Sequence, residues 1–413
     1  MRSDCQAIAN EIQDLEEQLA AVGQGIQNCL ADAHSPGERQ ACIREGQAES
    51  KPLRAELGKA KQRLEQCLPT MVNWAIVLCK PDDDLSEAQP REFFEALFKG
   101  VGNGSIRDYY AELTNDKVDL SGCEILGWFR LKFKKLELTN PTVVHDRQTN
   151  IYIACKDISE RYGVDFRKYS GVVVIYNYQL GDGGAAGIGA QNTMDLNGAN
   201  QNYSQLLFDS AAWGEIDEAG RVKLESAWSH TFVAHEVGHG LGLDHSRGAN
   251  NNDYGDRFDI MSAMDVASYF DKRKFGRSGP GLNPPNLMTL KSIFAENIYQ
   301  CYLEPNPAHP TKFDDTIELQ RLDAAPNSLK AIQIHQNNGT FYTISYRTKS
   351  NWDRELGIVG IGILQLHFVD VQGRNSIIDQ CEVSKEIKLG SLVLSLGIAN
   401  ETFGRLTLQN AYK

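Results

Sequence analysis

HEVGHGLGLDH, residues 235–245, brings three histidines, one glutamate and three glycines together in one short stretch. The stretch follows a helix-prone run, 224–234, and in a continuing helix His235 and His239 lie one turn apart on the same face. Two neutral imidazoles at that spacing can bind one zinc ion. Glu236 then points beside the metal, where a general base for a metal-activated water must lie.

The second half of the stretch predicts a turn that returns the chain to the metal. Gly242 comes three positions after His239, and glycine readily takes the left-handed conformation that ends a helix. After such a turn His245 can reach the same ion, which leaves a fourth position open for water as in catalytic zinc sites. The alternatives are a helix end whose histidines bind no metal and a metal site that has lost catalysis.

The complete pattern, H-E-x-x-H-x-x-G-x-x-H, resembles the signature of the metzincin zinc endopeptidases. Residues 259–262, Asp-Ile-Met-Ser, resemble the Met-turn beneath the zinc in that clan, with Met261 as its methionine and Met264 as the alternative. Residues 254–257, YGDR, look most similar to the corresponding part of gametolysin-like and immune-inhibitor-like secreted metallopeptidases.

This resemblance implies an α/β catalytic domain, with a mixed twisted sheet and helices, over residues 70–300. It implies a protein or peptide substrate, with Glu236 as the general base. It also implies one catalytic Zn²⁺ ion with three protein ligands, which are His235, His239 and His245. The resemblance extends weakly to 301–413 and does not cover 1–69.

Bulk properties exclude several classes of protein. A chain of 413 residues is expected to form about two or three domains. The net charge of −12, without a basic block, argues against nucleic acid or an anionic membrane surface as a partner. The longest apolar run, 358–369, is too short and too polar to span a membrane.

Residues 1–69 predict a helical hairpin. Residues 35–37, Ser-Pro-Gly, mark its turn. Pro52 is expected to kink or restart the returning helix, with Ser50 as a cap. Apolar residues recur at spacings of three and four in the first helix, as in a coiled-coil seam: Cys5, Ile8, Ile12, Leu15, Leu19, Val22, Ile26 and Cys29.

The hairpin cysteines predict two disulfides, Cys5–Cys67 and Cys29–Cys42, because both pairs share nearly the same midpoint. Four buried free thiols are the alternative. Two disulfides indicate an oxidising compartment, so we expect a secreted protein whose signal peptide has been removed. We also expect the chain to be active with this hairpin attached, since no cysteine-switch motif is visible.

Five further cysteines leave at least one without a partner inside the chain. Cys123 with Cys155 and Cys301 with Cys381 are guesses at pairing, with Cys79 left over.

The catalytic region is expected to contain buried strands at 73–79 and 172–176. Helices are expected at 93–100, 105–113, 149–163 and 286–296. Residues 185–190 are the candidate for an edge strand that pairs with an extended substrate, although an ordinary surface loop fits equally well.

Three aspartates follow the histidine stretch, at Asp253, Asp256 and Asp259. Clustered carboxylates can bind Ca²⁺, because hard cations take several oxygen ligands. A solvated loop is the simpler interpretation of the same composition.

Residues 301–413 predict an antiparallel β-sandwich, because short alternating runs are separated by turn residues. This domain could contact substrate or glycan, or simply stabilise its neighbour. The sequence as a whole predicts a secreted zinc-dependent endopeptidase. The competing hypotheses are a hydrolase restricted to one special (glyco)protein, and a binding or toxin subunit in which proteolysis is incidental.

Overall fold

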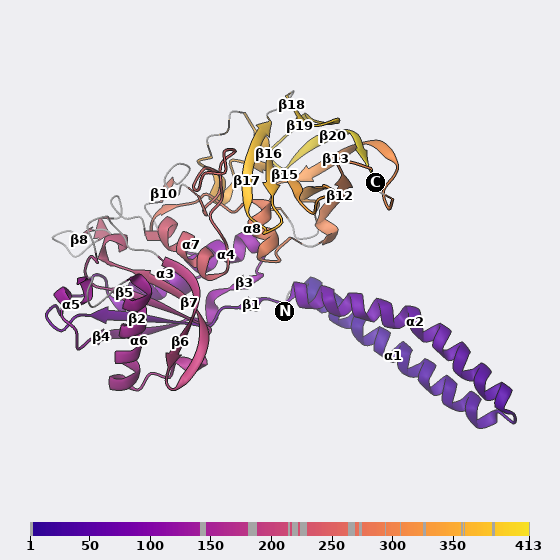
Figure 1. Cartoon of the computed structure of the whole chain (residues 1–413), viewed down its shortest axis with the longest axis horizontal. Coiled ribbons are helices and arrows are strands. Elements are labelled where there is room, and N and C mark those ends of the chain that lie inside the picture. Colours follow the sequence, from indigo (N-terminus) through magenta and orange to yellow (C-terminus); the bar gives the residue numbers. More distant parts are fainter. Residues whose placement is uncertain are drawn as a thin grey trace. The chain divides into compact units, whose positions relative to one another are not determined.

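The chain folds into two compact units, Met1–Thr70 and Met71–Lys413, and each is described by itself (Figure 1). None of the helices in the described segments is both long and apolar enough to cross a lipid bilayer. The computed structural model describes residues 3–140, 146–180, 188–213, 215–216, 222–223, 229–262, 269–271, 275–293, 295–305, 307–324, 328–356, 358, 360–381 and 385–412.

The first unit is an antiparallel helical hairpin, as the sequence predicts. Helix α1 (Ser3–Asp32) and helix α2 (Pro36–Cys67) pack along their length (Figure 1). Ser35 caps α2, because its side chain accepts a hydrogen bond from the Glu38 amide while the Glu38 carboxylate accepts from the Ser35 amide. Such a capping box contributes about 1 kcal/mol of stability to a helix.

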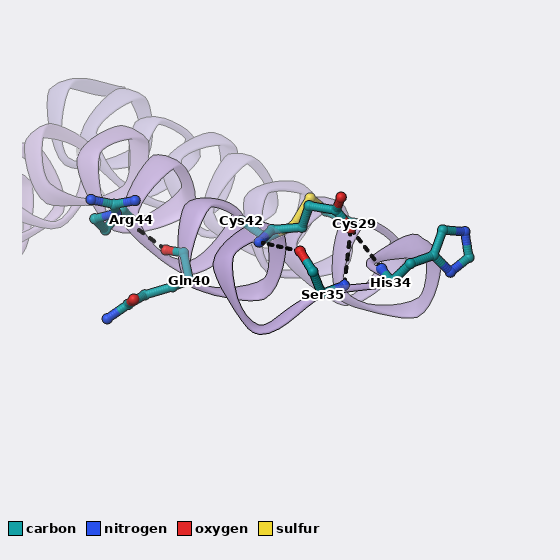
Figure 2. Close-up of a disulfide and its surroundings, with 7 residues drawn as sticks. Cys29, His34, Ser35, Gln40, Cys42 and Arg44 are labelled. Atoms are coloured by element: carbon teal, nitrogen blue, oxygen red, sulfur yellow. Dashed lines mark hydrogen bonds between the residues drawn. A yellow bond between two sulfur atoms is a disulfide. The ribbon is translucent and has the colours of Figure 1, made fainter.

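Both predicted disulfides of the hairpin are present, Cys5–Cys67 and Cys29–Cys42. Figure 2 shows the second disulfide beside the turn that carries Ser35. The expected helix restart at Pro52 is wrong, because α2 is continuous through that exposed residue. The Ser50 hydroxyl donates to a backbone carbonyl of the same helix and caps nothing.

We predict that this unit depends strongly on its disulfides. Its buried apolar side chains are few: Cys5, Leu15, Ala33, Cys42, Ala60 and Cys67. Replacing Cys29 and Cys42 together by serine should therefore lower the local stability by roughly 3 kcal/mol, the value typical for such a short loop. Hydrogen exchange of the full chain should speed up over residues 20–45, while exchange of the buried strand 171–176 should not change. Unaltered exchange over 20–45 would contradict this dependence.

The second unit contains a five-stranded mixed sheet in the order β4-β2-β5-β7-β6. The first four are parallel to one another, and β6 lies antiparallel at the edge. The bounds are β2 Trp74–Lys80, β4 Glu124–Arg130, β5 Gly171–Tyr176, β6 Ile188–Leu196 and β7 Ala199–Phe208. The mixed α/β character predicted for this region is confirmed.

Helices cover both faces of this sheet. The bounds are α3 Arg91–Lys99, α4 Ile106–Thr114, α5 Lys135–Thr139, α6 Arg147–Tyr162, α7 Ser229–Gly240 and α8 Pro284–Thr289. Side chains of β5 alternate between two cores: Val173 and Ile175 join α3, α4 and α7, whereas Val172 and Val174 join α6. This alternation follows from the two-residue period of a strand, and it makes β5 buried on both sides.

The chain also forms short strands: β1 Thr70–Met71, β3 Val118–Asp119, β8 Glu215–Ile216, β9 Val222–Lys223, β10 Tyr269–Asp271 and β11 Gly276–Ser278. The helix predicted over 286–296 differs from the structure. Helix α8 already ends at Thr289, because Lys291 takes a left-handed backbone with φ of 55° and the chain turns there.

The C-terminal strands form one nearly closed, barrel-like sheet, which corrects the predicted β-sandwich (Figure 1). Its order is β17-β16-β15-β14-β12-β20-β19-β18, with β13 also paired to β20. All pairs are antiparallel except β12 with β14. The bounds are β12 Ile298–Tyr302, β13 Lys312–Gln320, β14 Ala331–His335, β15 Phe341–Thr348, β16 Gly362–Val369, β17 Asn375–Cys381, β18 Glu386–Leu389, β19 Leu392–Ala399 and β20 Phe403–Tyr412.

The guessed Cys123–Cys155 disulfide is wrong. Both residues are buried free thiols that belong to the cores on opposite faces of the mixed sheet. The Cys123 thiol instead donates to the backbone carbonyl of Val72, at 3.6 Å. The Cys301–Cys381 pairing stays a prediction, because the Cys381 side chain lies outside what the structure describes.

Candidate metal centre

Helix α7 positions the first two histidines. It begins at Ser229 within the described residues, and 224–228, where the predicted helix begins, lie outside them. The helix ends at Gly240, and Gly242 takes the left-handed conformation with φ of 93° that the sequence predicts. The Leu243 amide then donates to the carbonyl of Gly238, at 2.9 Å. This tight turn directs the following residues back toward α7.

The turn brings His235, His239 and His245 into one group. Each imidazole offers a nitrogen that lies within 4.8 Å of the nitrogens of the other two. Among the histidine, cysteine, aspartate and glutamate side chains of the described residues, the three histidines form a group that could hold a metal ion. The ring centroids of His239 and His245 are 4.6 Å apart.

Hydrogen bonds to backbone carbonyls fix which nitrogen of each ring is free. His235 Nδ1 lies 2.7 Å from the carbonyl oxygen of Ile260, and His239 Nδ1 lies 2.7 Å from that of Leu243. A carbonyl oxygen only accepts, so both Nδ1 atoms carry the proton and both Nε2 atoms are bare. Burial and the neighbouring histidines lower the pKa of His235 to about 3, which keeps its ring neutral.

The two bare Nε2 atoms face each other at 3.1 Å. They cannot share a hydrogen bond, because neither carries a proton, and their lone pairs repel without a cation between them. A tetrahedral zinc with bonds of about 2.0–2.1 Å separates its nitrogen ligands by about 3.3 Å, close to this spacing. The donor set therefore fits a zinc ion, although imidazoles also suit other transition metals.

Glu236 follows His235 directly in the chain, but its carboxylate is not one of the grouped metal-binding side chains. Its side chain is only 7 % exposed, and burial raises its pKa to about 7, opposed in part by the positive charge of Arg147. A buried carboxyl with a pKa near neutrality is suited to accept and release a proton.

Met261 packs directly against the ligand-bearing helix. A side-chain carbon added to Gly238 would lie 2.3 Å from the Met261 sulfur, so only glycine permits this approach. The Ser246 amide donates to the Met261 carbonyl at 2.8 Å, which links this segment to His245. Met264, the alternative methionine, lies outside the described residues.

The three aspartates suggested as calcium ligands contact different partners. Asp253 pairs with Arg247 at 2.9 Å, and Asp256 pairs with His367 at 3.0 Å. The Asp259 carboxylate accepts from the Met261 amide at 2.6 Å. Asn283 and Asn286 also donate to Asp259. Asp256 and Asp259 are thus structural groups that shape the Met261 segment.

A chain of hydrogen bonds connects the barrel-like sheet to the backbone carbonyl that orients His235. The sequence did not reveal this connection. Arg347, on β15, donates from Nε to Asp353 at 2.9 Å, and the Asp353 carboxylate accepts from the Gly281 amide at 2.9 Å. The Gly281 carbonyl accepts from the amide of Ile260 at 3.1 Å. Ile260 is the residue whose carbonyl orients His235. No spacing rule could reveal these partners, because they lie about a hundred positions away in the sequence.

Tyr254, which the sequence shows only as the first residue of the YGDR stretch, also lies at the histidine group. Its ring centroid lies 4.2 Å from that of His245 and 6.2 Å from that of His235. Burial and the nearby carboxylates of Glu236 and Asp253 raise the pKa of its hydroxyl.

The predicted substrate edge is described only in part. Residues 188–190 begin β6, the antiparallel edge strand, whereas 185–187 lie outside the described residues. Helix α7 packs against β6. The metal group and the sheet edge are therefore neighbouring features of the fold.

Comparison with models of known protein families and with curated proteins finds no match to this chain.

Proposed function

We propose that the chain is a secreted zinc-dependent endopeptidase of the metzincin type. The observation that carries the proposal is the pair of bare Nε2 atoms of His235 and His239 at 3.1 Å, with His245 completing the group. Three protein ligands favour catalysis over a structural role, because structural zinc sites use four. The two disulfides agree with an extracellular location.

A zinc ion in this group would lower the pKa of a water molecule to about 7 and polarise the carbonyl of the scissile peptide bond. Glu236 accepts the proton of the attacking water and delivers it to the leaving amine. Burial raises the pKa of its carboxyl, which favours acceptance of the proton. Among the described strands β6 pairs with β7 alone, so its other side could bind an extended peptide through backbone hydrogen bonds, without strong sequence preference.

Metal content and casein cleavage together test the proposal. We expect one zinc per chain and cleavage of unstructured casein, with activity lost on chelation and restored by added zinc. His239→Ala should lose both the zinc and the cleavage. His34→Ala is the matched control, because His34 is an exposed histidine of the hairpin (Figure 2). A parent chain that contains no metal and does not take up zinc would refute the assignment.

A further inference from the structure

Tyr254 has a backbone conformation that its residue type disfavours. Its φ is 63°, in the left-handed region. Among the described non-glycine residues in this region, all except Tyr254 and Lys291 are asparagine or aspartate. Those two residue types tolerate the conformation through local hydrogen bonds, whereas tyrosine gains nothing comparable. A strained residue beside a candidate active site is a reason to look for function.

The burial of apolar surface does not explain why position 254 carries a tyrosine. The residue is 47 % exposed, so a large part of its surface remains in water. A smaller polar residue would fit the backbone better and would expose less apolar surface.

The surrounding loop holds Tyr254 in place. The Arg247–Asp253 ion pair ties the two ends of the loop together. Gly248 and Gly255 approach so closely that a side-chain carbon on Gly255 would lie 2.3 Å from the Gly248 backbone. The loop is therefore built to hold the ring against His245, with its outer side open to solvent.

We propose that the Tyr254 hydroxyl donates a hydrogen bond to the scissile carbonyl oxygen as negative charge develops on that oxygen. The inference rests on the proposed peptidase function. A neutral phenol is a donor, and the half-exposed Tyr254 ring lies against His245, so a substrate at the histidine group would lie close to it. A positioned donor of this kind stabilises the transition state more than the substrate. Glu236 and Tyr254 would then act on different reacting atoms, the water and the carbonyl oxygen.

Tyr254→Phe tests the proposal, because it keeps the ring and removes only the hydroxyl. We expect kcat to fall about 10- to 100-fold, the usual loss for a hydrogen bond to a charged group, with KM and zinc content unchanged. A phosphinic pseudo-peptide, which mimics the tetrahedral transition state, should bind more weakly by the same factor in calorimetry. A peptide with the sequence of the cleaved product should bind equally well to both proteins.

Two further variants control for packing and strain. Tyr162→Phe removes the hydroxyl of a tyrosine with similar exposure, 43 %, at the end of α6, and it should leave kcat unchanged. Tyr254→Asn should relieve the backbone strain, so it should fold at least as stably as the parent and still show the loss of kcat.

The outcomes separate this inference from the proposed function. A parent that binds no zinc or cleaves no peptide would overturn both. An active parent whose Tyr254→Phe variant has the same kcat and the same affinity for the phosphinic peptide would overturn this inference alone. In that case Tyr254 would serve only to pack against His245.

Discussion

Glu236→Gln is expected to lower kcat for peptide hydrolysis by about 10²- to 10⁴-fold, the usual contribution of a general acid–base group. The amide has the shape of the carboxylate but cannot accept the proton of the attacking water. Zinc content should not change, because Glu236 is not part of the histidine group. Steady-state cleavage of a fluorogenic peptide and metal analysis of the same samples measure both quantities.

Asp244→Asn is the matched control for this variant. It removes a negative charge from an exposed residue next to His245 without removing the proposed base. We expect its kcat to stay within a few fold of the parent. If both variants lost activity equally, the effect would be one of net charge, and Glu236 would lose its assigned role.

The same variant should change how the stability of the metal-free protein depends on pH. The folded-state pKa of Glu236, about 7, lies above its ordinary value of 4.5, so ionisation is disfavoured in the folded chain. The contribution of Glu236 to the free energy of unfolding is therefore fully present below pH 4.5, and it is lost as the pH rises through about 7.

Metal-free Glu236→Gln should therefore be more stable than the metal-free parent at pH 8, by at most about 3 kcal/mol, and should lose that advantage near pH 4.5. Urea unfolding of both proteins at the two pH values measures the difference. The histidines titrate in both proteins, so their contributions cancel. A difference that does not vary with pH would contradict the buried-carboxyl account.

Arg347→Met is expected to lower the free energy of unfolding by about 3–5 kcal/mol, as is usual when one partner of a buried ion pair is removed. The guanidinium side chain is 0 % exposed and pairs with Asp353. It also compensates the charges of Asp256 and Asp259. Its removal takes this compensating positive charge away from Asp353, Asp256 and Asp259. Chemical unfolding of the zinc-free and zinc-loaded protein measures the loss.

The zinc affinity of Arg347→Met should also fall, by up to about tenfold, because the Asp353–Gly281–Ile260 chain no longer orients His235 as firmly. Arg374→Met is the control, since Arg374 forms an exposed ion pair with Asp370 that is worth about 1 kcal/mol or less. Equal losses in the two arginine variants would show that the buried network has no special role.

Local signals in the sequence predicted the parts of the site that depend on local structure. The spacing of His235 and His239 follows from the helical turn, and Gly242 is the residue that a left-handed turn favours. The hairpin disulfides follow from antiparallel pairing of two long helices. The strand at 172–176 follows from its run of β-branched residues. The helical turn, the glycine turn and the strand each depend on residues that are close in the sequence. The disulfides depend on the antiparallel alignment of two helices about one turn.

The remaining features depend on contacts between distant residues. The partner of Asp256 is His367, 111 positions away, and no local pattern in the sequence points to it. Alternating residues identified the C-terminal strands, but alternation does not determine whether strands form two packed sheets or one nearly closed sheet. The position of Tyr254 depends on the path of a loop that no periodic pattern describes.

Asp256 and Asp353 contact residues that are synthesised later than the histidine group. These contacts therefore affect when that group reaches its final geometry during synthesis. The ribosome releases the histidine ligands of 235–245 well before Arg347 and His367 emerge. Until those two residues arrive, Asp256 lacks its His367 partner, and both Asp256 and Asp259 lack the positive charge of Arg347. A nascent chain therefore carries the three histidines before it can hold them in their final geometry. Because N-terminal parts generally fold first during synthesis, the histidine group reaches its final geometry only late.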